Sequence, residues 1–238
     1  MSDKTWKTQE LLDFCPKDLT DNADVYVKAV RSKIERILFL VDRFTVTEDL
    51  TLKLGSAQFL KTQLEVEIYI ESIASNLHSL ADVLAHIINE IVLKPLLPCD
   101  EHISSEQVDL NKVKTKLDKV KTKLVGLTLD SAKDRYISQI IDSIVNLSSS
   151  SEFLYISGFV NTIKHRRLVN TTFHLTVDRG SLIDLGFRLD EFDYKGSHFP
   201  EMSCRNIVID YREKLIDFIF DIGNSVNNYC RANSIQTV

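Results

Sequence analysis

One short segment, residues 161–167, combines the side chains needed for proton transfer and for phosphate binding. It reads Asn-Thr-Ile-Lys-His-Arg-Arg and lies where a helical apolar pattern gives way to an alternating one. The imidazole of His165 can move a proton near neutral pH. Asn161 lies one helical turn before it, so both side chains share a face. This combination suits cleavage of RNA without a metal, in which the 2′-hydroxyl is the internal nucleophile.

In this interpretation each polar residue of the segment has a role. His165 is the acid or base and Asn161 positions the substrate, while Arg166 and Lys164 hold phosphate and stabilise developing charge. Arg167 is a further contact to nucleic acid. A simpler explanation stays open, because cations in the last turn of a helix also offset the negative end of the helix dipole without any ligand.

A second set of polar residues follows one stripe of the long apolar pattern that ends at Pro95. Spacing of four between carboxylate and imidazole groups can bind a divalent metal, but any amphipathic helix has such a polar face. A third interpretation places Asp82 beside His165, where it fixes the imidazole and raises its pKa. We predict neither a metal nor a cofactor. The stripe consists of Glu71, His78, Asp82, His86 and Glu90.

The third candidate is a repeat in which Lys-Val-Lys-Thr-Lys-Leu occurs at 112–117 and again at 119–124. Its lysines could follow a phosphate backbone by charge alone, or form a solvated arm. Between Val108 and Leu129 there is no aromatic residue, so base stacking is not supported there. The apolar seam predicts a helix that packs on a neighbouring helix, through Val113, Leu117, Val120 and Leu124.

The elements that position these residues are mostly helices. The 238 residues contain 7 Gly and 4 Pro, which favours long helices over a many-stranded fold. Apolar spacings of three and four predict helices from Asp21 to Phe44, from Gly55 to Pro95, from Ser104 through the lysine repeat, over 131–147 and over 149–165. The longest of these has an apolar set that includes Leu60, Leu64, Ile68, Ile73, Leu77, Leu80, Leu84, Ile87, Ile88 and Ile91.

After residue 165 the apolar period becomes two, which predicts a β-hairpin over 167–194. A last helix is expected over 203–231, and residues 1–20 read as a surface leader. We therefore expect one mainly α domain spanning 1–238, an up-and-down helical bundle with one long helix and the hairpin inserted before the last helix.

The chain resembles the HEPN superfamily, a group of helical proteins that includes ribonuclease toxins and antiviral effectors. The resemblance covers about Gln58 to His165 and the last helix. In the family motif an Arg, commonly followed by Asn, precedes a His by four to six residues. Asn161 and His165 match this motif, while Val160 stands at the Arg position. Arg167 and His174 form a second match within the alternating pattern. The resemblance implies a dimeric scaffold that binds RNA, as in toxin or defence systems.

The net charge and the cysteines limit which functional classes remain possible. A net charge of −5 excludes a global positive field, and four widely spaced cysteines predict reduced thiols. We expect no membrane span and a cytoplasmic protein. The leading prediction is RNA binding with metal-independent cleavage. The alternatives are a noncatalytic interaction protein, acting as a homodimer or holding a protein partner, and a metal enzyme that uses the polar stripe.

Overall fold

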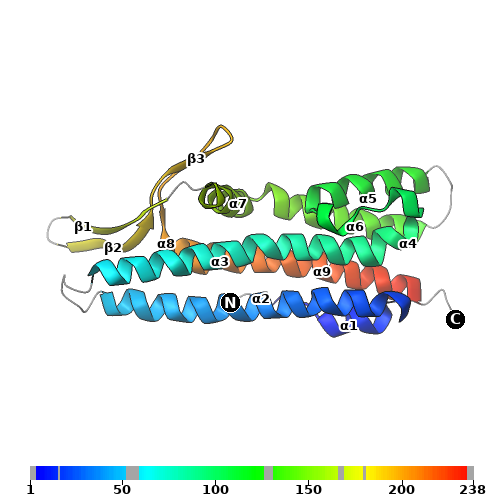
Figure 1. The fold of residues 1–238 in the computed structure, drawn as a ribbon, viewed down its shortest axis with the longest axis horizontal. Helices are drawn as coiled ribbons and strands as arrows, with labels where there is room; N and C mark the ends of the chain where they lie inside the picture. Colours follow the sequence, from blue (N-terminus) through cyan, green and yellow to red (C-terminus); the bar gives the residue numbers. More distant parts are fainter. Residues whose placement is uncertain are drawn as a thin grey trace. The chain divides into compact units, whose positions relative to one another are not determined.

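The chain is mainly α-helical, with small antiparallel sheets before the last long helix (Figure 1). The computed structural model describes residues 4–15, 17–51, 59–125, 131–165, 169–178 and 181–234. The chain divides into two compact units, the first made of Met1–Ser32, Ser79–Ser150 and Ile216–Val238 and the second of Lys33–His78 and Ser151–Leu215. The sequence predicted one domain. Long helices contribute residues to both units, so the apolar pattern has no break at the boundaries.

Two long helices follow a short first helix, where the sequence predicted one shorter helix followed by one long helix. Helix α2 (Lys17–Thr51) extends well beyond the predicted Asp21–Phe44 stripe, and α3 (Phe59–Ile88) follows it. α3 continues through a π-helical turn, η2 (Asn89–Leu93), into α4 (Lys94–Leu96). The predicted end near Pro95 is thus confirmed within a few residues.

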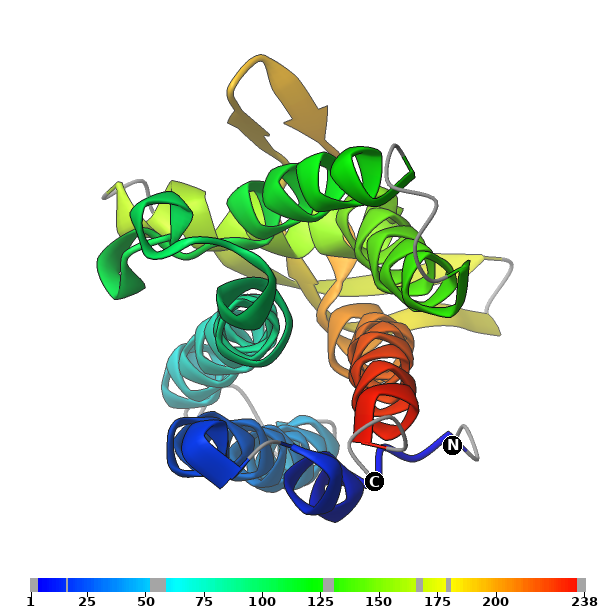
Figure 2. The ribbon, with the colours of Figure 1, turned by 90° about the vertical axis from the view of Figure 1, so that its right-hand side faces the viewer.

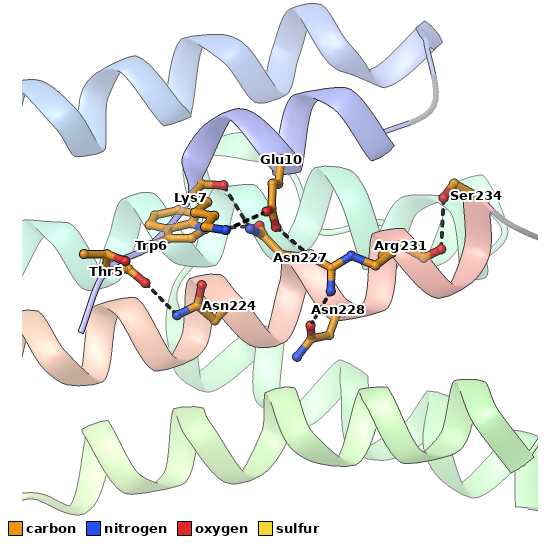
Figure 3. A network of polar contacts seen from close by, with 9 residues as sticks. All are labelled: Thr5, Trp6, Lys7, Glu10, Asn224, Asn227, Asn228, Arg231 and Ser234. Carbon is orange, nitrogen blue, oxygen red and sulfur yellow. Dashed lines mark hydrogen bonds and ion pairs between the residues drawn. The ribbon is translucent and has the colours of Figure 1, made fainter. Parts of the chain in front are cut away.

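The predicted surface leader is wrong for the described part of residues 1–20. Residues Thr8–Phe14 form helix α1, and the side chains of Trp6 and Leu11 are buried in the first unit. The segment also bonds to the last helix, α9 (Arg212–Ser234), through side chains of both elements (Figure 3). The prediction failed because it rested on the polar composition of the segment and overlooked the two large apolar residues.

The lysine repeat forms α5 (Leu110–Val125), and α5 packs against α6 (Ser131–Ser149), as expected (Figure 2). Val113, Leu117 and Val120 are buried along the predicted seam. Ser104, where the sequence predicted the start of this helix, instead precedes a turn of 3-10 helix, η4 (Ser105–Gln107). Another such turn, η3 (Cys99–Glu101), lies before it. The N-cap of α5 is Asp109, whose Oδ1 accepts a 2.8 Å hydrogen bond from the backbone N of Lys112.

The second unit contains α7 (Ser151–Lys164) and all the described strands. β1 (Thr171–Asp178) and β2 (Ser181–Leu189) pair antiparallel, with Phe173 opposite Phe187, and this confirms the predicted hairpin. β5 (Met202–Ser203) extends the same sheet, and α8 (Cys204–Asn206) and the π-turn η5 (Ile207–Tyr211) then lead into α9. The predicted C-terminal helix over 203–231 is therefore present with a π-helical turn near its start.

A second hairpin was not predicted from the apolar period. β3 (Phe192–Tyr194) and β4 (Ser197–Phe199) are joined by Lys195 and Gly196, both with positive φ, and project away from the first sheet (Figures 1 and 2). Strands of three residues are too short to show an alternating pattern. A cluster of aromatic rings, Tyr155, Phe159, Phe192, Phe199 and Tyr211, joins this hairpin to α7 and η5.

Candidate functional site

His165 and Lys164 lie at the C-terminal end of α7, and both are exposed. His165 forms the turn that ends the helix, and its backbone N donates to the carbonyl oxygens of Asn161 (3.3 Å) and Thr162 (3.2 Å). Both side chains are therefore accessible to solvent, and their roles in proton transfer and phosphate binding stay predictions. Arg166 and Arg167, the other two cations of the predicted site, lie outside the described residues.

The amide of Asn161 is turned back onto its own helix. Its Nδ2 donates to the carbonyl oxygen of Ser157 at 2.8 Å and approaches the Ser157 hydroxyl at 3.4 Å. These contacts direct the amide nitrogen of Asn161 onto the preceding turn of its own helix.

Val160, at the position where the family motif has an arginine, belongs to the core. It is 1% exposed, and Phe159 and Thr162, which lie near it on the same helix, are buried as well. An arginine here would bury its charge among apolar side chains, which is costly without a partner. The helix therefore presents this position to the interior, away from any substrate in solvent.

Asp82 is exposed on α3 and belongs to the first unit, whereas Asn161 and His165 belong to the second. Its proposed contact with His165 stays a prediction.

A pocket of about 200 Å³ lies in the second unit, where α7 ends and the strands begin. Asp190 accepts a 3.0 Å hydrogen bond from the Thr172 hydroxyl, and Asp193 contacts Nδ1 of His198 at 3.1 Å. Because carboxylates dominate the polar lining, the pocket disfavours phosphate. It is lined by Thr162, Val169, Asn170, Asp190, Glu191, Phe192 and Asp193.

His174, the histidine of the second motif match, lies on β1 in a network that the sequence did not predict. Its Nε2 lies 3.0 Å from the Thr172 hydroxyl oxygen and 3.6 Å from Oε2 of Glu201. The Thr172 proton goes to Asp190, so the hydroxyl oxygen accepts from Nε2 of His174, and the neutral ring carries its lone pair on Nδ1. Arg188 pairs with the other oxygen of Glu201 at 2.7 Å.

This network holds the imidazole in one tautomer, as a general base requires. The His174 side chain is 37% exposed, so substrate could reach it. Sequence spacing alone could not find Glu201, which is distant along the chain. The alternation over 167–194 did place Thr172 and His174 on one face, which was the available signal.

The polar stripe of α3 does not form a metal site in the part of the chain that the structure describes. No group of three or more His, Cys, Asp or Glu residues within the described ranges could hold a metal ion. Three of these polar residues have other partners instead. The ring of His78 stacks on Phe153, the ring of His86 stacks on Tyr26, and Glu90 pairs with Lys94 at 2.7 Å.

Several lysines of α5 bond to the protein itself. Lys123 pairs with Glu101 at 2.9 Å, Lys114 pairs with Asp118 at 3.1 Å, and Lys116 donates to the Glu101 carbonyl oxygen at 2.8 Å. The two contacts with Glu101 hold α5 on the segment that precedes it, while the pair of Lys114 and Asp118 lies within the helix. They support the interpretation of the repeat as a packed arm more than that of a track for nucleic acid.

The most unusual surface feature lies on the N-terminal half of α3. Leu60, Leu64 and Ile68, which belong to the long apolar pattern, are 79%, 56% and 51% exposed. The buried face of the same segment consists of Val66, Ile70 and Ile73. We call the three exposed residues the α3 stripe; one lies on each successive turn, opposite the core.

No family model, curated protein or solved structure matches this chain. Across the described residues, no helix combines the length and apolar character needed to cross a bilayer.

Proposed function

We propose that the protein is a noncatalytic helical interaction protein, which binds another protein chain through the α3 stripe. The observation that carries this proposal is the exposure of Leu60, Leu64 and Ile68 on three successive turns of one helix. Single exposed apolar residues are common, whereas a contiguous apolar patch marks an interaction surface. A helix whose opposite face is already packed can offer such a stripe without rearranging the core.

The groups expected for catalysis at the end of α7 support the same proposal. Val160 is buried and the Asn161 amide is bonded to its own helix, so neither is placed to act on a substrate.

A photo-crosslinking amino acid placed at residue 64 tests the proposal. The matched control carries it at Leu154, an apolar residue of α7 that is 49% exposed in the same unit. We expect covalent adducts from position 64 in cells that make the protein, and few from position 154. Equal yields at the two positions would contradict an interaction surface on α3.

RNA binding with metal-independent cleavage is the second candidate, favoured by the network that orients His174. The Nε2 proton of this residue faces Thr172 and Glu201, which leaves Nδ1 to accept the proton of a 2′-hydroxyl. Arg188 pairs with Glu201 in the same network.

Incubation of a structured RNA with purified protein in EDTA tests this candidate. His174→Ala and His165→Ala should each be compared with His198→Ala, a change at a histidine that is 59% exposed on β4. Cleavage that is lost in one of the first two variants and kept in the third supports a nuclease. If the unmodified protein neither binds nor cleaves the RNA, this candidate is removed.

A further inference from the structure

We infer that a pocket between α5 and the segment before it binds a small organic carboxylate, a molecule with an apolar body and one carboxylate group. The pocket has a volume of about 330 Å³ and lies within the first unit. Its lining side chains come from residues between 102 and 107 and from residues of α5 between 111 and 116. The α3 stripe belongs to the second unit, so this inference goes beyond the proposed function and depends on other residues.

The size and the wall of the pocket suit a small organic molecule. Ligand sites in proteins commonly have volumes of about 300–1,000 Å³ and mainly apolar walls with a few polar groups. This pocket lies at the lower end of that range, and apolar atoms make up most of its wall. Ile103, which is 7% exposed, supplies part of this apolar surface. A ligand that fits the wall therefore needs an apolar body, which a free phosphate ion lacks.

The imidazole of His102 forms a fixed part of the wall. Its Nε2 lies 3.1 Å from the Lys94 carbonyl oxygen and 3.0 Å from the Leu97 carbonyl oxygen. A carbonyl oxygen can only accept, so Nε2 carries the proton and donates to both oxygens. These bonds hold the ring in its orientation without any ligand, so the pocket is preformed on this side.

Two ammonium groups of α5 give the pocket its charge. Lys112 and Lys116 lie one helical turn apart, so their side chains share a face of the helix. Lys112 donates to the Gln107 carbonyl oxygen at 3.0 Å, and Lys116 donates to the Glu101 carbonyl oxygen at 2.8 Å. Among the described residues that line the pocket, none is acidic. The pocket therefore favours an anionic group near these two lysines.

The two lysines differ in how much of their charge is available to a ligand. The carboxylate of Asp109 lies 3.7 Å from Nζ of Lys112 and partly neutralises that ammonium group. Lys116 bonds to a neutral carbonyl oxygen, and its three N–H groups exceed what one such bond requires. The Glu101 carboxylate interacts with Lys116 at longer range but pairs directly with Lys123 at 2.9 Å. Lys116 is therefore the stronger anchor for a carboxylate.

Titration of the purified full chain with hexanoate, followed by nuclear magnetic resonance, tests the inference. The side-chain amide groups of Gln107 and Asn111 line the pocket and report on binding directly. We expect their signals to shift in a saturable way, with a dissociation constant of about 1 mM for so small a molecule. Unchanged signals at about tenfold that concentration would overturn the site.

Two further probes separate the charge of the ligand from its apolar body. Hexanol has the same chain without the charge, and inorganic phosphate has negative charge without an apolar body. Each should bind at least about tenfold more weakly than hexanoate. Equal binding of hexanol would contradict an anionic ligand, and equal binding of inorganic phosphate would contradict an organic one.

Replacement of single lysines by methionine separates the two cations. Lys116→Met removes the charge, keeps most of the side-chain length and should weaken hexanoate binding by about tenfold. Lys112→Met should weaken it by only about threefold, because Asp109 already shares that charge. Lys116→Arg retains the charge and should retain binding. Lys121→Met, on the same helix but outside the lining, is the control. An equal loss in Lys121→Met and Lys116→Met would overturn the assigned anchor.

A larger side chain at Thr115 gives a measurement that leaves the charges unchanged. Thr115 is an exposed residue that lines the pocket, so Thr115→Phe fills space there and should abolish the response to hexanoate. Thr122→Phe is the matched control. Thr122 is also exposed, occupies the same place in the second copy of the repeat and, like Thr115, donates its hydroxyl to the carbonyl oxygen four residues earlier.

Circular dichroism checks that both threonine variants stay helical. Hexanoate binding that is lost in Thr115→Phe and kept in Thr122→Phe supports the pocket as the site. Unchanged binding in a folded Thr115→Phe variant would overturn it.

Discussion

The indole nitrogen of Trp6 donates a 3.1 Å hydrogen bond to Oδ1 of Asn227, although 221 positions separate the two residues (Figure 3). The same amide donates through Nδ2 to the carbonyl oxygen of Lys7 at 3.0 Å. Asn227 is 2% exposed, so one buried side chain satisfies a donor and an acceptor of the N-terminal segment. Ion pairs between Lys4 and Asp221 and between Glu10 and Arg231 flank it.

Replacement of Asn227 by Leu should release this segment. The change leaves the Trp6 N–H and the Lys7 carbonyl without partners, at a cost of about 2 kcal/mol in the free energy of unfolding. Trp6 is the single tryptophan of the chain, so its emission reports directly on the buried indole. Urea unfolding followed by fluorescence measures both effects. Asn228→Ala, on the same helix, should change stability by less than about 0.5 kcal/mol.

Gly223 allows the Trp6 ring to lie directly on α9. A Cβ atom at this position would overlap the ring, which is itself 7% exposed and held by Asn227. Gly223→Ala should therefore cost about 1–3 kcal/mol and shift Trp6 emission to the red.

Gly158→Ala is the matched comparison, because its Cβ would meet the outer end of the Phe199 ring at 2.7 Å. That ring is only half-buried and can move, so we expect a smaller loss of stability. A larger loss at Gly158 than at Gly223 would show that the contact with Trp6 is the more adaptable one.

The ion pair between Glu48 and Arg205 should give the second unit an asymmetric response to mutation. The Glu48 side chain is 5% exposed and that of Arg205 is 58% exposed, with 2.9 Å between Oε2 and Nη1. Arg205→Gln leaves a carboxylate buried without its partner and should cost about 1–3 kcal/mol at neutral pH. Glu48→Gln leaves a cation that water can solvate, and should cost less. Denaturant unfolding of both variants measures the difference.

The same pair predicts a direction for the dependence of stability on pH. Burial raises the pKa of the Glu48 carboxyl, and the opposing effect of Arg205 is smaller. The folded state thus favours the protonated acid, and this contribution is fully present below the unfolded pKa and lost as pH rises through the folded pKa. The stability of Glu48→Gln relative to the unmodified protein should rise with pH above about 4. A flat or falling difference would contradict the raised pKa.

An arginine introduced at residue 160 should damage the fold. Val160 is 1% exposed, so Val160→Arg places a charge in the core and should cost more than about 3 kcal/mol. Leu154→Arg, on the exposed face of the same helix, should change stability by less than about 0.5 kcal/mol. Thermal melting followed by circular dichroism compares the two. Equal melting temperatures would contradict the buried position of Val160.

The helices and the first hairpin could be predicted because their signal is local. Periods of three to four and of two follow from the geometry of one element and need no knowledge of its neighbours. The same reasoning could not show that Leu60, Leu64 and Ile68 are exposed, because spacing shows that residues share a face but not which face meets the core. Val66, Ile70 and Ile73 are buried on that helix instead.

The candidate site could be predicted only in its local part. Helical spacing correctly placed Asn161 and His165 at the end of one helix, and it could not show that the Asn161 amide bonds to Ser157. The partners of His174 were missed for a different reason. Glu201 reaches it through the pairing of separate strands, which is a non-local relationship.

The order in which a ribosome makes the chain sets a limit on how the first unit can be completed. Its three segments are Met1–Ser32, Ser79–Ser150 and Ile216–Val238, so the helix that carries Asn227 is synthesised after all of the second unit. Trp6 therefore has no docking site while the rest of the chain emerges. A nascent chain stalled near residue 215 should hold its indole in water, and chaperones that recognise exposed aromatic residues have that interval in which to bind it.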